Sequence, residues 1–245
     1  MKSIAIYNLK GGVGKTATAV NLAFHAAADS MRTLLWDMDA QAAASWYYNA
    51  EPDRRFKASR LVKAKIPLGS LIQKTAYEGL DIIPSDLSAR QLDVLLSAHG
   101  ENNLRHWLSA LSETYRLVII DCPPSLSELA LSVLTECDRV LVPAVPTHLS
   151  FATYRQIVAL MEDKKLDVRK LYPVLTMIDR RKALHQSFTR DCPTLLGRSA
   201  LGFIPYSSDV EKMGEFRRPL GDFAPRSTAA IAYRLLWENV RHHCL

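Results

Sequence analysis

The sequence predicts an α/β fold in which a single doubly wound, mostly parallel sheet carries helices on both faces. Short β-type runs alternate with helical segments along all 245 residues, which is typical of parallel strands joined by crossover helices. Hydrophobic residues make up 48% and charged residues 23%, which excludes a disordered or fibrous chain. We find no internal repeat, so residues 1–245 are expected to form a single domain.

The expected strands are short apolar runs, several of which end in an acidic residue. LVIID and RVLVP are apolar enough to be buried on both faces of a sheet. In chain order the expected strands are Ser3–Asn8, Arg32–Asp37, Leu80–Pro84, Leu117–Asp121, Arg139–Pro143, Tyr172–Ile178 and Leu201–Pro205. Ligands of such sheets bind beyond the carboxyl ends of the strands.

Helical segments separate these runs, beginning with an alanine-rich stretch. The expected helices are Lys15–Ala28, Gln41–Tyr48, Ser88–Ser97, Asn103–Thr114, Ser150–Asp163 and Ala224–Arg241. Arg54–Lys65 is an exception, because it holds six basic residues and no acidic one. We interpret it as an exposed loop on a helical face; a second phosphate-facing patch is the alternative.

Composition also indicates where the protein works. No apolar stretch is long enough for a transmembrane helix, and the first apolar run is too short for a signal peptide. The four cysteines are scattered without a CxxC pair, which argues against a zinc site or a disulfide framework. A cytoplasmic protein is therefore expected.

The positive charge is concentrated in the last third of the chain. Residues 1–150 are electrically neutral, and residues 151–245 carry the whole net charge of +6. An anionic partner would be nucleic acid first and an acidic membrane surface second. On charge alone, a solvated basic surface is the more common explanation.

The segment LKGGVGKT, Leu9–Thr16, joins the first strand to the first helix. The backbone of Gly11, Gly12, Val13 and Gly14 can approach phosphate oxygens closely, and the helix N-terminus adds positive potential. The Lys15 ammonium can reach the β- and γ-phosphates, and the Thr16 hydroxyl can bind Mg²⁺. This pattern predicts a phosphate-binding loop for a nucleotide.

The loop departs from GxxxxGK[ST], because Leu9 stands at the first glycine and Lys10 is an additional lysine. KGGVGKT resembles the deviant Walker A box of the ParA/MinD group of P-loop ATPases. In that family the first lysine reaches across a dimer to the nucleotide of the other subunit, so the resemblance gives Lys10 that role. It also implies ATP and Mg²⁺ as cofactors and a weak ATPase activity.

Two carboxylates end the second strand, at Asp37 and Asp39, and their spacing places both on one side of an extended chain. The family pattern is DxDPQ, and Ala40 replaces its proline here. By resemblance, Asp39 positions or activates the attacking water. For Asp37 a place in the Mg²⁺ shell and a helix-capping role remain equally open. Asp121 ends a Walker B-type strand and would hold Mg²⁺.

Other positions follow the family less closely. Cys122 lies in a segment similar to the family's DxPP switch and is interpreted as a buried thiol rather than a nucleophile. Ala17 replaces a threonine that contacts the α-phosphate in many relatives. Asp179 and Pro205 resemble positions that flank the adenine base.

Three classes of protein use such a site, and the sequence favours a small ParA-type partition ATPase. The resemblance implies an ATP-bound homodimer that binds duplex DNA without sequence preference, is nucleoid-associated, and hydrolyses ATP when a ParB-like or cargo-adaptor protein stimulates it. The arginines expected at the DNA surface are Arg190, Arg198, Arg217, Arg218 and Arg226. The chain begins at its first strand, so no N-terminal operator-binding extension is expected. The cargo is left open.

The alternative is a MinD-like membrane ATPase, which needs an amphipathic tail rich in Lys and Phe or Leu. WENVRHHCL has one Arg and no Lys, so membrane binding is not expected. We expect the last helix, with Ile231, Leu235 and Leu236, to pack on the core. A nitrogenase-type iron protein is rejected, because Cys122 and Cys137 lack its cysteine context.

Overall fold

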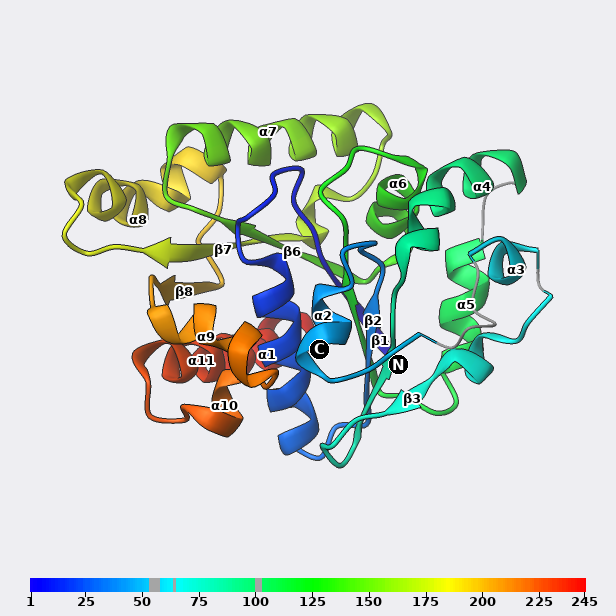
Figure 1. Cartoon of the computed structure of the whole chain (residues 1–245). Helices are drawn as coiled ribbons and strands as arrows, with labels where there is room; N and C mark the ends of the chain where they lie inside the picture. Colours follow the sequence, from blue (N-terminus) through cyan, green and yellow to red (C-terminus); the bar gives the residue numbers. More distant parts are fainter. Residues whose placement is uncertain (53–57, 64, 100–102) are drawn as a thin grey trace.

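The computed structural model describes residues 1–52, 58–63, 65–99 and 103–245. Its described residues contain an eight-stranded sheet in the order β3-β4-β2-β5-β1-β6-β7-β8 (Figure 1). The strands are β1 (Lys2–Ile6), β2 (Thr33–Asp37), β3 (Gln73–Lys74), β4 (Leu80–Ile83), β5 (Leu117–Asp121), β6 (Arg139–Ala144), β7 (Leu171–Ile178) and β8 (Gly202–Pro205). All neighbours pair in parallel except β3 and β4. The predicted doubly wound sheet is confirmed.

Helices cover both faces of the sheet. The α-helices are α1 (Lys15–Ala28), α2 (Ala43–Tyr47), α3 (Ala58–Val62), α4 (Leu92–His99), α5 (Asn103–Leu111), α6 (Glu128–Glu136), α7 (His148–Asp163), α8 (Ala183–Leu196), α9 (Ser208–Phe216), α10 (Leu220–Phe223) and α11 (Thr228–Cys244). Residues of α1, α9, α10 and α11 share one core with Ile4 and Ile6. Residues of α4 to α8 share the other with Ala5 and Tyr7. The period of two in β1 thus separates the two cores.

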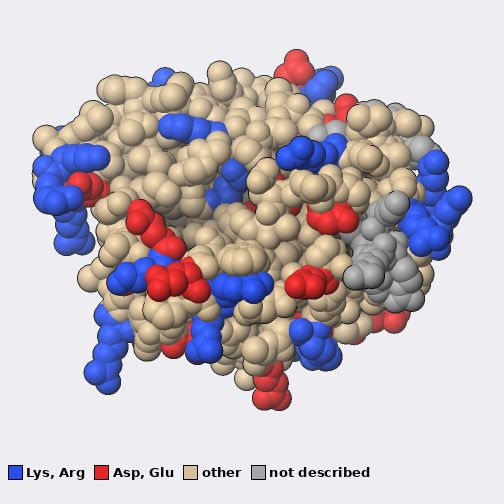
Figure 2. Space-filling model, in the orientation of Figure 1, with Lys and Arg blue, Asp and Glu red and all other residues tan. Residues whose placement is uncertain are grey.

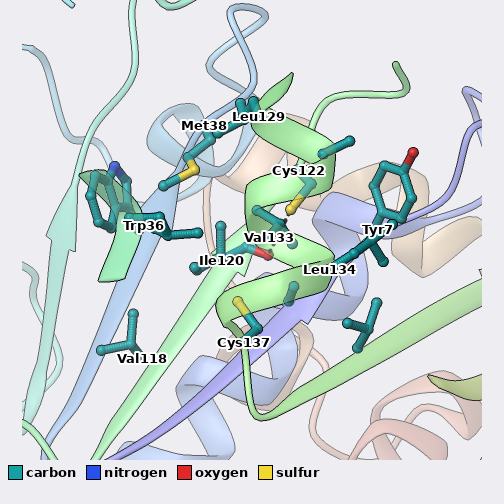
Figure 3. Packing of buried hydrophobic residues seen from close by; sticks show 14 of the residues in the cluster. Tyr7, Trp36, Met38, Val118, Ile120, Cys122, Leu129, Val133, Leu134 and Cys137 are labelled. Atoms are coloured by element: carbon teal, nitrogen blue, oxygen red, sulfur yellow. Dashed lines mark hydrogen bonds between the residues drawn. The ribbon is translucent and has the colours of Figure 1, made fainter. Parts of the chain in front are cut away.

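Helix α6 packs directly on the central strands (Figure 3). Val133 and Leu134 are fully buried among side chains from β1, β2 and β5. Cys122, just beyond β5, lies in the same cluster and is 2% exposed. Burial raises the pKa of its thiol well above the ordinary value. The prediction of a buried Cys122 is confirmed.

Several element boundaries differ from the sequence prediction for local reasons. Helix α7 begins earlier, because the Thr147 hydroxyl accepts a hydrogen bond from the Ser150 amide. Helix α11 begins later than Ala224, because Ser227 caps it, and it continues to Cys244. The segment 88–97 starts as a 3₁₀ turn. The helices α3, α6, α8, α9 and α10 and strand β3 were not predicted.

Helix α8 shows why an element was missed. Proline usually disrupts the interior of a helix, yet Pro193 lies inside this one. Residues 54–57 and 64 of the basic stretch Arg54–Lys65 lie outside the described residues, and Ala58–Val62 within it forms α3. In the described parts of the chain, no helix combines the length and apolar character needed to cross a bilayer.

Candidate functional site

The glycine loop lies between β1 and α1, at the carboxyl edge of the sheet. Gly12 and Gly14 adopt φ angles of 70° and 84°, a region that side chains other than glycine rarely enter. A Cβ added at Gly11 or Gly12 would meet nothing within 4 Å. The loop is therefore open on the side where a ligand can approach its backbone.

Two buried side chains fix this loop to neighbouring strands. The Asn8 amide donates to the Pro143 carbonyl at 2.7 Å, which ties the loop's start to β6. The Thr176 hydroxyl donates to the Val13 carbonyl at 2.9 Å, which ties its middle to β7. Sequence reasoning missed both anchors, because their partners are 135 and 163 residues away.

Lys15 begins α1 and is almost completely buried. Its ammonium donates to the Lys10 carbonyl at 3.2 Å. Burial lowers its pKa, and the nearby carboxylates of Asp121 and Asp39 oppose this shift. The ammonium is thus held in the loop next to two acids, and a phosphate could replace its carbonyl partner.

Asp121, the last residue of β5, is fully buried, and among the described residues neither of its carboxylate oxygens has a hydrogen-bond partner of ordinary geometry. Burial and the Asp37 charge raise its pKa well above the ordinary value, while Thr16 and Lys15 lower it. A buried carboxylate without partners is costly and calls for a ligand. Hard oxygen ligands of this kind suit Mg²⁺.

Asp37 is opposite Asp121 across β2 and β5, but its oxygens are already occupied. One accepts from the Ser45 amide and hydroxyl at 2.8 and 2.7 Å, and the other from the Asp39 amide at 3.1 Å. The Ser45 hydroxyl in turn accepts from the Ser85 amide. Asp37 therefore holds α2 in place, and its role in a metal shell remains a prediction.

The other two residues predicted to act in catalysis are more accessible. Asp39 is half-buried, and one carboxylate oxygen accepts from the Gln41 amide at 2.9 Å. Lys10 is also half-buried, and its amide donates to Asn8. Within the described residues, no hydrogen bond or ion pair engages the Lys10 ammonium. It is free to bind an anion beyond its own loop.

Of the two residues predicted to flank the base, Pro205 shares a cavity with the phosphate loop, and Asp179 lies outside that cavity. Pro205 and Gly14 line a cavity of about 60 Å³ together with Met177. The Asp179 carboxylate instead binds the Arg181 guanidinium through two hydrogen bonds of 2.9 Å. Pro205 is thus beside the phosphate loop, whereas the Asp179 carboxylate is paired with Arg181, and its contact with a base remains a prediction.

The five candidate DNA-binding arginines are not grouped on one surface. Arg198 donates to the carbonyls of Arg169 and Leu171 at the start of β7 and lies 4.1 Å from the Tyr172 ring centre. That is the amino edge of the sheet, opposite the glycine loop. Arg190, on α8, pairs with its neighbour Asp191.

Three of these arginines lie near α9 to α11. Arg217 stacks on the Trp46 ring at 3.8 Å and donates to the Trp46 carbonyl. Arg218 is exposed and lies 3.7 Å from Asp222, and Arg226 is exposed. Arg218 and Arg226 are therefore accessible to an anionic partner, whereas Arg217 is engaged in tertiary contacts.

The orphaned carboxylate yields a stability prediction. We expect Asp121→Asn to raise the melting temperature of the nucleotide-free protein near neutral pH by about 3–6 °C, or about 1.5 kcal/mol in a chain of this size. The folded state binds the Asp121 proton more tightly than the unfolded state does, so the ionised form destabilises the fold. As the pH falls through the raised pKa, Asp121 of the wild type becomes protonated, so the difference in melting temperature between the variant and the wild type should shrink.

Thermal melts at neutral and acidic pH without Mg²⁺ test this. Adding MgADP should then raise the melting temperature of the wild type but not of the variant. A variant less stable than the wild type at both pH values would show that the ionised Asp121 carboxylate does not destabilise the fold.

A β1–glycine loop–α1 unit, with a buried lysine and an acid at the end of β5, defines a P-loop nucleotide-binding protein. A family model described as an AAA domain matches residues 1–171. The chain belongs to the ParA/MinD family of ATPases.

Curated relatives cover almost the whole chain. This chain is 33% identical to the sporulation initiation inhibitor protein Soj of Bacillus subtilis over 98% of both chains. It is 31% identical to the chromosome partitioning protein ParA of Caulobacter vibrioides, over 98% of this chain and 94% of that protein. These similarities support a ParA-type ATPase.

Solved structures share the fold at lower identity. A plasmid partition protein from Borrelia burgdorferi bound to AMPPNP gives a TM-score of 0.84 at 22% identity over 98% of both chains. The cell division ATPase MinD of Pyrococcus furiosus gives 0.82 at 18% identity, with the same coverage.

Proposed function

We propose that this chain is a partition or positioning ATPase whose ATP-bound homodimer binds duplex DNA. In this proposal residues 1–245 act as one domain in the cytoplasm, on the nucleoid. An adaptor protein of the ParB kind stimulates hydrolysis, and the cycle moves a plasmid, a chromosome region or a protein cargo. The observation that carries the proposal is the Lys10 ammonium of the phosphate loop, which no hydrogen bond or ion pair engages within the described residues.

The residues present fit a magnesium nucleotide. The backbone of Gly11, Gly12, Val13 and Gly14 would surround the phosphates, with Lys15 as the main charged contact. Thr16 and Asp121 would hold Mg²⁺, with the two unsatisfied Asp121 oxygens facing water ligands or the ion. The ion would neutralise charge on the phosphates. Asp39 would orient the attacking water.

Exposed apolar side chains around the loop support a dimer. Leu87, Leu126 and Leu149 are 61–68% exposed. They follow the carboxyl ends of β4, β5 and β6, so all three lie toward the edge of the sheet that carries the loop. Exposed apolar groups concentrated around one site indicate an association surface. A second copy there would bring each Lys10 toward the partner's nucleotide.

DNA binding would involve the accessible basic residues near α10 and α11. Arg218 and Arg226 are exposed, and contacts to phosphates carry no sequence information. We do not include Arg198, because its guanidinium is occupied by backbone carbonyls and a ring. A dimer would carry Arg218 and Arg226 twice. Because dimerisation requires ATP in this proposal, the affinity for DNA would also depend on ATP.

We expect the ATP-bound dimer to bind duplex DNA of any sequence with a log–log salt slope of about −5, for about six phosphate contacts. Arg218→Glu combined with Arg226→Glu should weaken binding at least about tenfold and reduce the slope. The readout is fluorescence anisotropy across a salt series. Arg169→Glu is the matched control, because Arg169 is 87% exposed but lies before β7 on the far edge.

The membrane alternative is tested by liposome pelleting carried out alongside the DNA titration. Trp237, Val240 and Cys244 of α11 are at most 2% exposed, so this helix packs on the core as expected. Ile231 and Leu235 of the same helix lie on its outer side and are 39% and 51% exposed. ATP-dependent pelleting with anionic liposomes, without retention on DNA, would replace the partition proposal by a MinD-like one.

We also expect slow basal turnover, well below the ~10 s⁻¹ typical of enzymes. The reason is that completion of the site would require the second subunit's Lys10 and an adaptor. A steady-state phosphate-release assay of the pure protein, with and without DNA, measures it. Fast turnover by the protein alone would contradict a partner-controlled switch.

A further inference from the structure

A groove of about 710 Å³ lies at the open edge of the sheet, between β8 and α11. We propose that it binds an acidic, partly apolar segment of a partner protein, which adds to the sheet as a strand beside β8. The groove contains none of the phosphate-loop residues, but the two predicted base-flanking residues, Asp179 and Pro205, line it, so the proposal is tested in nucleotide-free protein. It concerns a surface separate from the dimer edge described above.

The floor and walls of the groove are apolar yet open to solvent. Phe203, Tyr206, Ile231 and Leu235 are each between 39% and 56% exposed, and all four line it. Ile231 and Leu235 are four residues apart and thus lie on one face of α11. Large apolar side chains gathered in one concave site mark a binding surface rather than scattered exposure.

Strand β8 offers a backbone edge next to these side chains. Among the described residues it pairs only with β7, so its other side carries peptide groups that a further strand can bind. Gly202 lets α11 pack closely on β8, because a Cβ there would lie 2.6 Å from Leu236 of α11. An extended segment with alternating apolar side chains suits this geometry better than a helix.

The charge at one end of the groove selects the partner. Arg180 and Arg181 line it, and exposed Lys182 follows. Asp179 neutralises only Arg181, and within the described residues no ion pair engages the Arg180 guanidinium. Figure 2 shows basic side chains gathered over the segment that joins β7 to α8. Acidic residues at one end of the bound segment would complement this charge.

Two other occupants fit less well. Duplex DNA would use the arginines but would leave the four exposed apolar side chains against phosphates and sugars. A second copy of this chain would bring a β8 edge with no acidic run, since residues 201–208 contain no carboxylate. An acidic apolar segment uses both the charge and the apolar surface.

The test uses nucleotide-free protein and a fluorescein-labelled peptide of about ten residues, in which valine and leucine alternate with threonine and a run of glutamates closes one end. Its counterpart carries lysines in place of the glutamates. We expect the acidic peptide to bind at least about tenfold more tightly than the lysine peptide. Hydrogen exchange at Phe203 and Ile204 should slow when it binds.

Leu235→Asp and Arg180→Glu should each weaken binding of the acidic peptide at least about fivefold. Val94→Asp is the matched control, because Val94 is an exposed apolar residue of α4 on the other face. Unchanged ATP-dependent dimerisation in Leu235→Asp would show that the variant folds. Equal binding of both peptides, displacement of the peptide by a DNA duplex, or self-association of the chain through β8 would each overturn the proposal.

Discussion

Lys15→Ala should lower the affinity for ATP at least about 100-fold and abolish ATP-dependent dimerisation. Hydrogen bonds to charged groups contribute about 1.5–3 kcal/mol each, and 1.4 kcal/mol is a factor of ten in affinity. In the free protein the Lys15 ammonium also faces Asp121 and Asp39, so its loss leaves two acids without an opposing charge. Calorimetric titration with ATP and Mg²⁺ measures the binding.

The matched control is Lys10→Ala, which removes the other lysine of the same loop. Its carbonyl, which accepts from Lys15, is retained, so a single subunit should bind ATP with nearly wild-type affinity. Dimerisation should nevertheless be lost. If Lys10→Ala weakened ATP binding as much as Lys15→Ala did, Lys10 would act within its own subunit and the proposed exchange across the dimer would be wrong.

Asp39→Ala should reduce hydrolysis by about 10²–10⁴-fold, the usual contribution of a positioned acid–base group, while ATP binding and dimerisation persist. The structure supports this separation, because within the described residues the Asp39 carboxylate accepts only from the Gln41 amide in its own turn, whereas the Asp37 carboxylate holds α2. Single-turnover phosphate release measures the chemical step.

Asp163→Ala is the control for this experiment, since Asp163 is 74% exposed at the end of α7. It should leave both hydrolysis and dimerisation unchanged. An Asp39→Ala protein that hydrolysed ATP at the wild-type rate would place the water-orienting role on another residue.

The sequence was sufficient for every described strand except β3, because short apolar runs such as LVIID are typical of strands that are buried on both faces of a parallel sheet. It was also sufficient for the local phosphate loop, whose residues are consecutive. The anchors of that loop were not predictable, because Asn8 and Thr176 act through distant carbonyls. Asp37 illustrates the same limit: the sequence left a place in the Mg²⁺ shell and a helix-capping role equally open, and the hydrogen bonds that Ser45 of α2 donates to its carboxylate were not predictable.

The basic residues show a further limit of sequence reasoning. Net charge located the excess in the last third of the chain but not on one face. The sequence does not distinguish Arg198 from Arg217. In the structure Arg198 lies at the amino edge of the sheet, whereas Arg217 stacks on Trp46 of α2. Only the fold separates arginines that serve packing from those, such as Arg226, that remain accessible.

Sedimentation of the Asp39→Ala protein with saturating ATP and Mg²⁺ shows whether Lys10 joins two subunits, because slow hydrolysis in this variant keeps ATP bound. We expect a dimer with ATP, a monomer with ADP, and a monomer in both nucleotides once Lys10→Ala is added. A monomer of Asp39→Ala under saturating ATP, or a dimer that persists without the Lys10 ammonium, would contradict this expectation.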